Sequence, residues 1–198
     1  MPISDKHKVV FVHIPKNGGT SVEKNLDMFE TGHKNWSYYK NRYPDRWRNY
    51  ESIAVIRNPF DRLVSCYNYA KMERSYWHST DGNAIYGKHP DYNVCNELEF
   101  NQLMQGFLIG KIQLKQLGWT PQSNWILGPS GIMVDRLILI EHLSQWMDNL
   151  CKTKTKKLNT SRDEGDRWES YYSKETKDLV LKNFSTDFKI YQELKNEK

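Results

Sequence analysis

The sequence predicts an α/β protein in which helices flank a central, mostly parallel sheet. Three short apolar runs rich in β-branched residues are each followed by a helical pattern, and they cover residues 8–14, 52–57 and 135–141. Strands that alternate with helices favour parallel pairing, because each helix carries the chain back to the end of the sheet where the next strand starts. The 198 residues suffice for a sizeable core, and we expect a single domain over 1–198.

The first predicted strand is "KVVFVHI" (8–14), which is closed by Pro15. Thr20 and Glu23 then fit a capping box, T-x-x-E, in which each side chain bonds the backbone N–H of the other residue. A helix should therefore begin at about Ser21.

The second predicted strand is "SIAVIR" (52–57). It leads to Asn58, a favourable N-cap, and to Pro59, which suits the first position of a helix. The sequence therefore predicts a helix over 59–73.

The third predicted strand, 135–141, leads into a helix from about 142 to 151. The C-terminal part has the pattern of two helices, over 174–184 and 186–195, and Ser173 is a plausible cap for the first of them. In a parallel sheet, ligands bind where the strands end and the helices begin, so the loops at those ends are the places to look for a site.

Composition limits the class of protein. The net charge of +5 mildly favours an anionic ligand, but it is too small and too evenly spread to indicate nucleic acid. No window approaches 18 consecutive apolar residues, so we expect no membrane partner. The N-terminus lacks a basic segment followed by an apolar one, and we expect a cytoplasmic protein. The sequence carries no signal for the oligomeric state.

The cysteines and histidines give no pattern of a disulfide framework or a metal site. Cys66, Cys95 and Cys151 are odd in number and far apart, and they form no C-x-x-C pair. We expect them to be reduced and buried. The six histidines include no H-E-x-x-H spacing, and we expect no metal ion.

The loop after the first strand combines a cation, two glycines and two hydroxyls. These are Lys16, Gly18, Gly19, Thr20 and Ser21. Glycines let the backbone approach a ligand closely, and unpaired N–H groups at a helix start suit a phosphate. The loop differs from the nucleotide-binding motif G-x-x-x-x-G-K-[ST], because Lys16 precedes the glycines. The alternative is a plain strand-to-helix turn in which the lysine serves solubility.

The second loop ends the strand with Arg57 and places Ser65 about two turns into the following helix. Arg57 should lie at the same edge of the sheet as Lys16, where its guanidinium can hold a phosphate through two hydrogen bonds. The alternative for Arg57 is an ion pair with a carboxylate. Two loops of this kind at one edge indicate a ligand with two separated anionic groups.

The two stretches "HIPKNGGTS" (13–21) and "IRNPFDRLVSCY" (56–67) together resemble sulfotransferases that use 3′-phosphoadenosine 5′-phosphosulfate (PAPS). The resemblance is to the carbohydrate-type group, that is, to sulfotransferase family 2 and its heparan sulfate 2-O-sulfotransferase-like members. Weaker similarity continues in "PQSNWI" (121–126), "VDRLILIEHL" (134–143) and "LNTS" (158–161). Asn17 departs from the family motif, which usually has threonine there.

The resemblance implies a P-loop-like three-layer fold and transfer of a sulfuryl group from PAPS to an acceptor hydroxyl, with adenosine 3′,5′-bisphosphate (PAP) as product. It implies that Lys16 contacts the phosphosulfate and stabilises charge on the bridging oxygen. It also implies that Arg57 and Ser65 hold the 3′-phosphate. The residues implied around the 5′-phosphate are Asn17, Gly18, Gly19, Thr20 and Ser21. Those implied in a loop over the nucleotide are Asn159, Thr160 and Ser161.

The acceptor hydroxyl must lose a proton, and histidine is suited to this task at neutral pH. His33, in "TGHKNWSYYK" (31–40), precedes the second strand as the base does in similar carbohydrate sulfotransferases. We therefore predict His33 as the base. The alternatives are a surface role for His33 and a carboxylate base such as Glu23. His13, at the end of the first strand, is interpreted as structural.

The acceptor that we expect is a carbohydrate. Aromatic side chains over 36–50 suit sugar rings, although they equally suit the apolar side of a short helix. Two other functions stay open at this point. One is another phosphate-handling enzyme such as a kinase. The lack of a metal-binding aspartate after the second strand argues against this alternative. The other is a non-catalytic module that binds anionic glycans or nucleotides and would not need His33.

Overall fold

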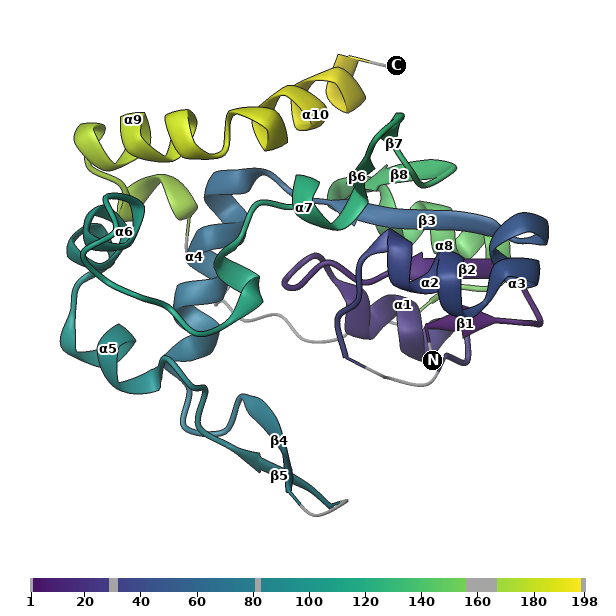
Figure 1. The fold of residues 1–198 in the computed structure, drawn as a ribbon, viewed down its shortest axis with the longest axis horizontal. Helices are drawn as coiled ribbons and strands as arrows, with labels where there is room; N and C mark the ends of the chain where they lie inside the picture. Colours follow the sequence, from purple (N-terminus) through teal and green to yellow (C-terminus); the bar gives the residue numbers. More distant parts are fainter. Residues whose placement is uncertain (1, 29–31, 81–82, 156–166, 197–198) are drawn as a thin grey trace. The chain divides into compact units, whose positions relative to one another are not determined.

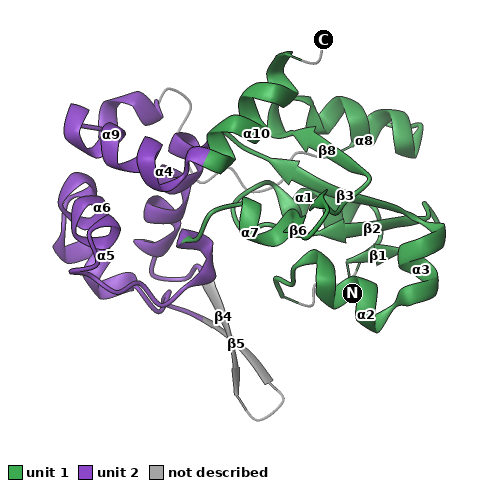
Figure 2. Ribbon diagram, turned by 45° about the horizontal axis from the view of Figure 1, so that its top comes forward, with its two compact units in different colours: residues 1–58, 120–159, 186–198 green, residues 59–119, 160–185 purple. Residues whose placement is uncertain are grey.

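The computed structural model describes residues 2–28, 32–80, 83–155 and 167–196. Contacts between residues divide the chain into two compact units (Figure 2). The first unit consists of residues 1–58, 120–159 and 186–198, and the second of residues 59–119 and 160–185. The single domain expected over 1–198 stays a prediction.

The first unit contains a four-stranded sheet in the order β1-β2-β3-β8 (Figure 1). Its strands are β1 (Ile3–Ser4), β2 (Val9–Val12), β3 (Glu51–Ile56) and β8 (Arg136–Leu139). β2, β3 and β8 run parallel, so the mostly parallel sheet predicted from the sequence is confirmed. The antiparallel edge strand β1 lies outside the sequence prediction, because two residues leave no periodic pattern.

Side chains of the central strands alternate between two apolar layers. In β2, Val9 and Phe11 belong to one core cluster, while Val10 and Val12 belong to the other. All four residues of the strand are buried. A strand covered on both faces has a continuous apolar sequence, and this is the pattern by which the strand was predicted.

Helices pack on both faces of this sheet. The core on one face includes residues of α1 (Gly19–Asn25) and α8 (Leu143–Cys151). The core on the other face includes residues of α2 (Trp36–Arg42), α7 (Ser123–Ile126) and α10 (Ser185–Asn196). The unit also contains α3 (Pro44–Asn49), the hairpin of β6 (Leu127–Gly128) and β7 (Gly131–Ile132), and the 3₁₀ helix η2 (Ile140–His142). Because both faces are apolar, the polar groups described below lie at the ends of the strands.

The start of α1 differs from the predicted one. The N-cap is Gly18, in a left-handed conformation with φ of 77°, and no side chain caps the helix. The helix begins at Gly19, two residues before the predicted start. Glu23 bonds His13 instead of reaching back to the helix start, so the predicted capping box with Thr20 is wrong. A buried carboxylate gains more from an imidazole partner than a cap at the helix start can offer.

The second unit is mostly helical. Its helices are α4 (Pro59–Ala70), α5 (Tyr92–Glu97), α6 (Phe100–Leu108), α9 (Lys174–Asn183) and the 3₁₀ helices η1 (Leu117–Trp119) and η3 (Trp168–Tyr171). A hairpin of β4 (Tyr76–Thr80) and β5 (Asn83–Gly87) completes it. As predicted, α4 begins at Pro59 and Ser173 caps α9, because its side chain accepts the backbone N–H of Thr176.

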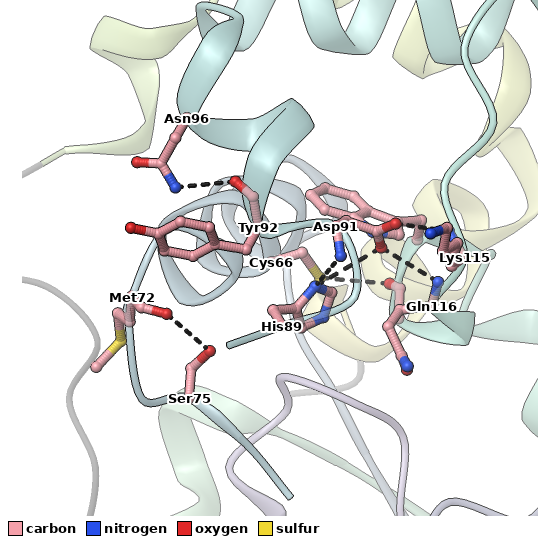
Figure 3. Close-up of polar contacts among 11 residues, drawn as sticks. Cys66, Met72, Ser75, His89, Asp91, Tyr92, Asn96, Lys115 and Gln116 are labelled. Atoms are coloured by element: carbon pink, nitrogen blue, oxygen red, sulfur yellow. Dashed lines mark hydrogen bonds and ion pairs between the residues drawn. The ribbon is translucent and has the colours of Figure 1, made fainter. Parts of the chain in front are cut away.

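A buried carboxylate connects separate segments of the second unit (Figure 3). Asp91 is 2% exposed and accepts the backbone N–H groups of Lys115 at 2.8 Å and Gln116 at 3.2 Å. It also accepts Nε1–H of Trp119 at 3.0 Å, and Nδ1 of His89 accepts the Asp91 N–H at 3.1 Å. A buried carboxylate that accepts three N–H groups holds chain segments together, and we interpret this cluster as structural.

The cysteines are free thiols, as expected. Cys66 and Cys95 are buried, whereas Cys151 is only half-buried. Among the described residues, no helix is both long enough and apolar enough to cross a membrane.

Candidate functional site

Two loops of the first unit leave neighbouring parallel strands at the same end of the sheet. β2 and β3 pair with Val12 opposite Ala54, so the chain segments that follow them emerge side by side. Nη1 of Arg57 donates a hydrogen bond to the backbone oxygen of Lys16 at 2.9 Å. The structure therefore brings together the two loops that carry the cations expected at this edge.

The loop between β2 and α1 turns through two left-handed positions. Lys16 has a φ of 68° and Gly18 a φ of 77°. The backbone N–H of Ser21 donates to the Gly18 oxygen at 3.0 Å and closes the first turn of the helix. Half-buried and buried positions alternate along the loop. The half-buried residues are Lys16, Gly18 and Thr20, and the buried ones are Asn17, Gly19 and Ser21. The accessible positions thus include the cation and one of the two hydroxyls.

The imidazole of His13 packs against Gly19. A Cβ added at Gly19 would lie 1.9 Å from Nε2 of His13, so no larger residue fits there. Nδ1 of His13 is 2.9 Å from Oε1 of Glu23, and the two side chains are 7% and 4% exposed. This buried pair holds the imidazole against the loop, which is a structural role for His13.

His33 lies beside His13. Their ring centroids are 4.3 Å apart with the rings edge to face, and Nδ1 of His33 is 3.1 Å from the backbone oxygen of His13. A carbonyl oxygen can only accept a hydrogen bond, so this contact places the proton of neutral His33 on Nδ1 and the lone pair on Nε2. His33 is an exposed residue. A neutral imidazole in this tautomer is the form that a general base requires.

The side chain of Asn17 points into the protein. Nδ2 donates to the backbone oxygen of Val55 at 2.5 Å and to Oε1 of Gln122 at 2.6 Å. Asn17 is fully buried. Its amide therefore supports the loop from within.

The charges around the loop favour an anion. Lys16 and Arg57 contribute two positive charges, and the first turn of α1 carries no acidic residue. The carboxylate of Glu23 is already paired with His13. Within residues 2–28, 32–80, 83–155 and 167–196, no group of three or more His, Cys, Asp or Glu side chains is arranged to hold a metal ion.

Ser65 belongs to the second unit, where it lies on α4 and is 1% exposed. Its role toward the 3′-phosphate stays a prediction. Asn159, Thr160 and Ser161 lie outside the described residues.

Comparison with known proteins identifies the class of chemistry. A family model described as the sulfotransferase family matches residues 1–192. The chain belongs to the sulfotransferase family. The match extends over residues of both compact units, and family membership makes the protein a transferase that acts in sulfuryl transfer. Searches of curated proteins and of solved structures gave no significant match.

Two groups that support the loop of this sulfotransferase were not predicted in that role from the sequence. Glu23, which pairs with His13, ends a T-x-x-E pattern, but that pattern favoured a capping box with Thr20. Gln122 lies in "PQSNWI", a stretch with weak family similarity and no predicted role. Neither could be found from local pattern, because their contacts depend on how separate elements pack: His13 and Glu23 are 10 positions apart, and Gln122 is 65 and 105 positions from its partners.

Proposed function

We propose that this sulfotransferase transfers a sulfuryl group from PAPS to a hydroxyl of a carbohydrate acceptor and releases PAP. One observation carries the proposal: the Arg57 guanidinium bonds the backbone of Lys16, so the two predicted anion-holding loops meet at one place. A single ligand with more than one anionic group can therefore engage both loops. A P-loop-like, three-layer arrangement of this sheet and its helices belongs to the same proposal.

The residues of the loop suit a phosphosulfate group. Lys16 supplies an ammonium, Thr20 supplies an accessible hydroxyl, and Gly18 and Gly19 supply backbone N–H groups. Ser21 is buried, so we propose that it takes part through its backbone. For the 3′-phosphate we propose Arg57, which can donate two parallel hydrogen bonds, and Ser65. Asn17 is proposed to take part through its backbone, because its amide is directed inward. A role for Asn159, Thr160 and Ser161 in covering the nucleotide completes the proposed set.

In the proposed reaction, PAPS supplies the activated sulfur–oxygen bond, which breaks as the acceptor oxygen bonds to sulfur. His33 takes up the hydroxyl proton at Nε2, the nitrogen that its contact with the His13 carbonyl leaves unprotonated. Lys16 stabilises the negative charge that the electron pair brings to the bridging phosphate oxygen. Fixed donors of the protein thus supply the positive field around the leaving group.

The structure favours His33 over Glu23 as the proposed base. Glu23 is 3% exposed and its carboxylate bonds His13. A base must come within hydrogen-bond reach of the acceptor hydroxyl, and an exposed imidazole meets this condition better than a buried, paired carboxylate.

The carbohydrate part of the proposal is supported by aromatic rings on the helix that follows His33. Tyr38 is 40% exposed and Lys34 lies over its ring at 5.5 Å, while Trp36 is half-buried. Tyr39, by contrast, belongs to the apolar core. Aromatic rings with polar tips, a few positions after the proposed base in the chain, suit a sugar ring. Screening glycans and small alcohols with a radiolabelled sulfuryl donor would identify the acceptor.

The proposal is tested by calorimetry and by one substitution. We expect PAP to bind and ATP to bind at least about tenfold more weakly, since ATP lacks the 3′-phosphate. His33→Ala should lose turnover by about a hundredfold or more, the usual contribution of a general base, and keep its affinity for PAP. The matched control is His142→Ala, because His142 is also exposed and its side chain makes no cap bond.

Each competing function gives a different result. Tighter binding of ATP than of PAP would favour a kinase-like enzyme. Binding of PAP with no sulfuryl transfer to any acceptor would favour a binding module. Full activity of His33→Ala would remove His33 from the mechanism.

A further inference from the structure

Gln122 lies between the two loops of the site, immediately before α7, and is 1% exposed. Its Oε1 accepts Nδ2–H of Asn17 at 2.6 Å and the backbone N–H of Arg57 at 3.0 Å. Its Nε2 donates to the backbone oxygen of Arg57 at 2.9 Å. One side-chain amide thus contacts the lysine-glycine loop and the end of β3 at the same time.

The contacts with Arg57 replace a missing strand partner. β3 ends at Ile56, and the amide of Gln122 bonds both backbone groups of the next residue, as a neighbouring strand would. The backbone of Arg57 is therefore fixed one residue beyond the sheet. Its side chain then bonds the Lys16 oxygen at 2.9 Å, so the Arg57 guanidinium and the backbone of Lys16 are both linked to this amide.

Gln122 is itself held by a buried carboxylate from the C-terminal helix α10. Oδ2 of Asp187 accepts the Gln122 N–H at 2.6 Å, and Oδ1 accepts the Ser123 N–H at 2.8 Å. Asp187 is 1% exposed. Hydrogen bonds to a charged, buried acceptor are among the stronger ones in proteins, so the backbone at Gln122 is a firm anchor for its side chain.

We propose that Gln122 is a positioning residue that sets the distance between the two anion-holding loops and thereby the affinity for the nucleotide donor. The identity of the ligand rests on the proposed function. Gln122 is too buried to touch the ligand, so it acts through Asn17 and Arg57. Without its amide, the N–H and C=O of Arg57 and the Asn17 amide each lose a partner, and the loops are free to shift apart. Two phosphates at a fixed separation require two loops at a fixed separation.

The test compares Gln122→Met with Asn124→Ala. Methionine keeps the length and packing of the side chain but makes none of the three hydrogen bonds. Asn124 is the exposed residue two positions on and serves as the matched control. Binding of PAP is measured by calorimetry well below the melting temperature of each variant, and protection of the Arg57 amide is measured by hydrogen exchange without ligand.

We expect Gln122→Met to bind PAP about tenfold or more weakly, to exchange the Arg57 amide faster, and to raise KM for PAPS while KM for the acceptor stays within about twofold. Asn124→Ala should match the wild type in all three. A lowered melting temperature with unchanged PAP affinity would show a merely structural residue and overturn the inference. Unchanged exchange at Arg57 would overturn it as well. If the wild type itself fails to bind PAP, the proposed function falls, and the exchange measurement alone decides whether Gln122 holds the loop.

Discussion

Nε2 of His13 stands 1.9 Å from the point where a side chain at Gly19 would have to begin. The imidazole is held in this place by Glu23, which contacts its other nitrogen at 2.9 Å. The second glycine of the loop is therefore required by an internal contact, independently of any ligand.

Gly19→Ala should destabilise the protein by about 2 kcal/mol or more, because a methyl group there overlaps the imidazole and a packed interior relaxes only in part. In a His13→Ala background the same substitution should cost less than about 1 kcal/mol, since the overlapping ring is gone. The measurement is the free energy of unfolding in urea for the four proteins of this cycle. Equal costs in both backgrounds would show that the overlap is relieved elsewhere.

Asn17→Asp should destabilise more than Asn17→Ala, although aspartate has nearly the same shape as asparagine. The amide nitrogen faces two acceptors, the Val55 oxygen at 2.5 Å and Oε1 of Gln122 at 2.6 Å. A carboxylate in that buried place loses both bonds and repels both oxygens, at an added cost of about 1–3 kcal/mol. Urea unfolding at pH 7 measures the difference. An aspartate variant as stable as the alanine variant would mean that the Asn17 amide has the opposite orientation.

Tyr39→Phe should leave stability within about 1 kcal/mol of the wild type or raise it. The Tyr39 hydroxyl is buried and has no hydrogen-bond partner among the described residues. Burial, followed by the charge of Glu23, raises the pKa of Tyr39 well above its usual range, so the group stays neutral. The control is Tyr172→Phe, because the Tyr172 hydroxyl donates to the Phe60 oxygen at 2.9 Å. We expect the control to cost about 1 kcal/mol, and a larger loss at Tyr39 would reveal a hidden partner.

The contact of Asp5 with Arg46 should contribute to stability at neutral pH and stop doing so in acid. Hydrogen bonds from Arg46, then from Tyr50, lower the pKa of Asp5 from 3.8 to about 2. A carboxylate with a lowered folded-state pKa stabilises the fold above its unfolded-state pKa, and this stabilisation is lost as the pH falls through about 4 to about 2. The stability difference between wild type and Asp5→Asn should therefore shrink over this range.

Salt and Arg46→Lys provide the controls for this pair. Asp5 and Arg46 are exposed, so we expect the difference to be smaller in 1 M salt as well, where the Debye length is about 3 Å. Lysine keeps the charge but cannot reproduce the two contacts that Arg46 makes, at 2.8 and 3.1 Å, and should retain only part of the effect. A difference independent of pH between 6 and 2 would show that the contact contributes nothing.

Local sequence patterns were sufficient where burial itself creates the pattern. β2 and the second part of β3, residues 53–56, are buried and apolar without interruption, so both strands could be predicted within a few residues. Pro59 and Ser173 were correctly placed at helix starts, because helix starts favour these residue types through local geometry. The capping box failed, since Glu23 had a competing partner that no local pattern reveals.

The sequence by itself determined the α/β class, the parallel strands and the two basic loops at their ends, because each of these follows from periodicity or from neighbours along the chain. Only the tertiary structure decided which groups support those loops. Gln122 meets Arg57 across 65 positions and Asn17 across 105, and His33 meets the His13 carbonyl across 20. Contacts of this kind depend on how the strands and helices pack in three dimensions, and hydrogen bonds between distant residues leave no period in the sequence.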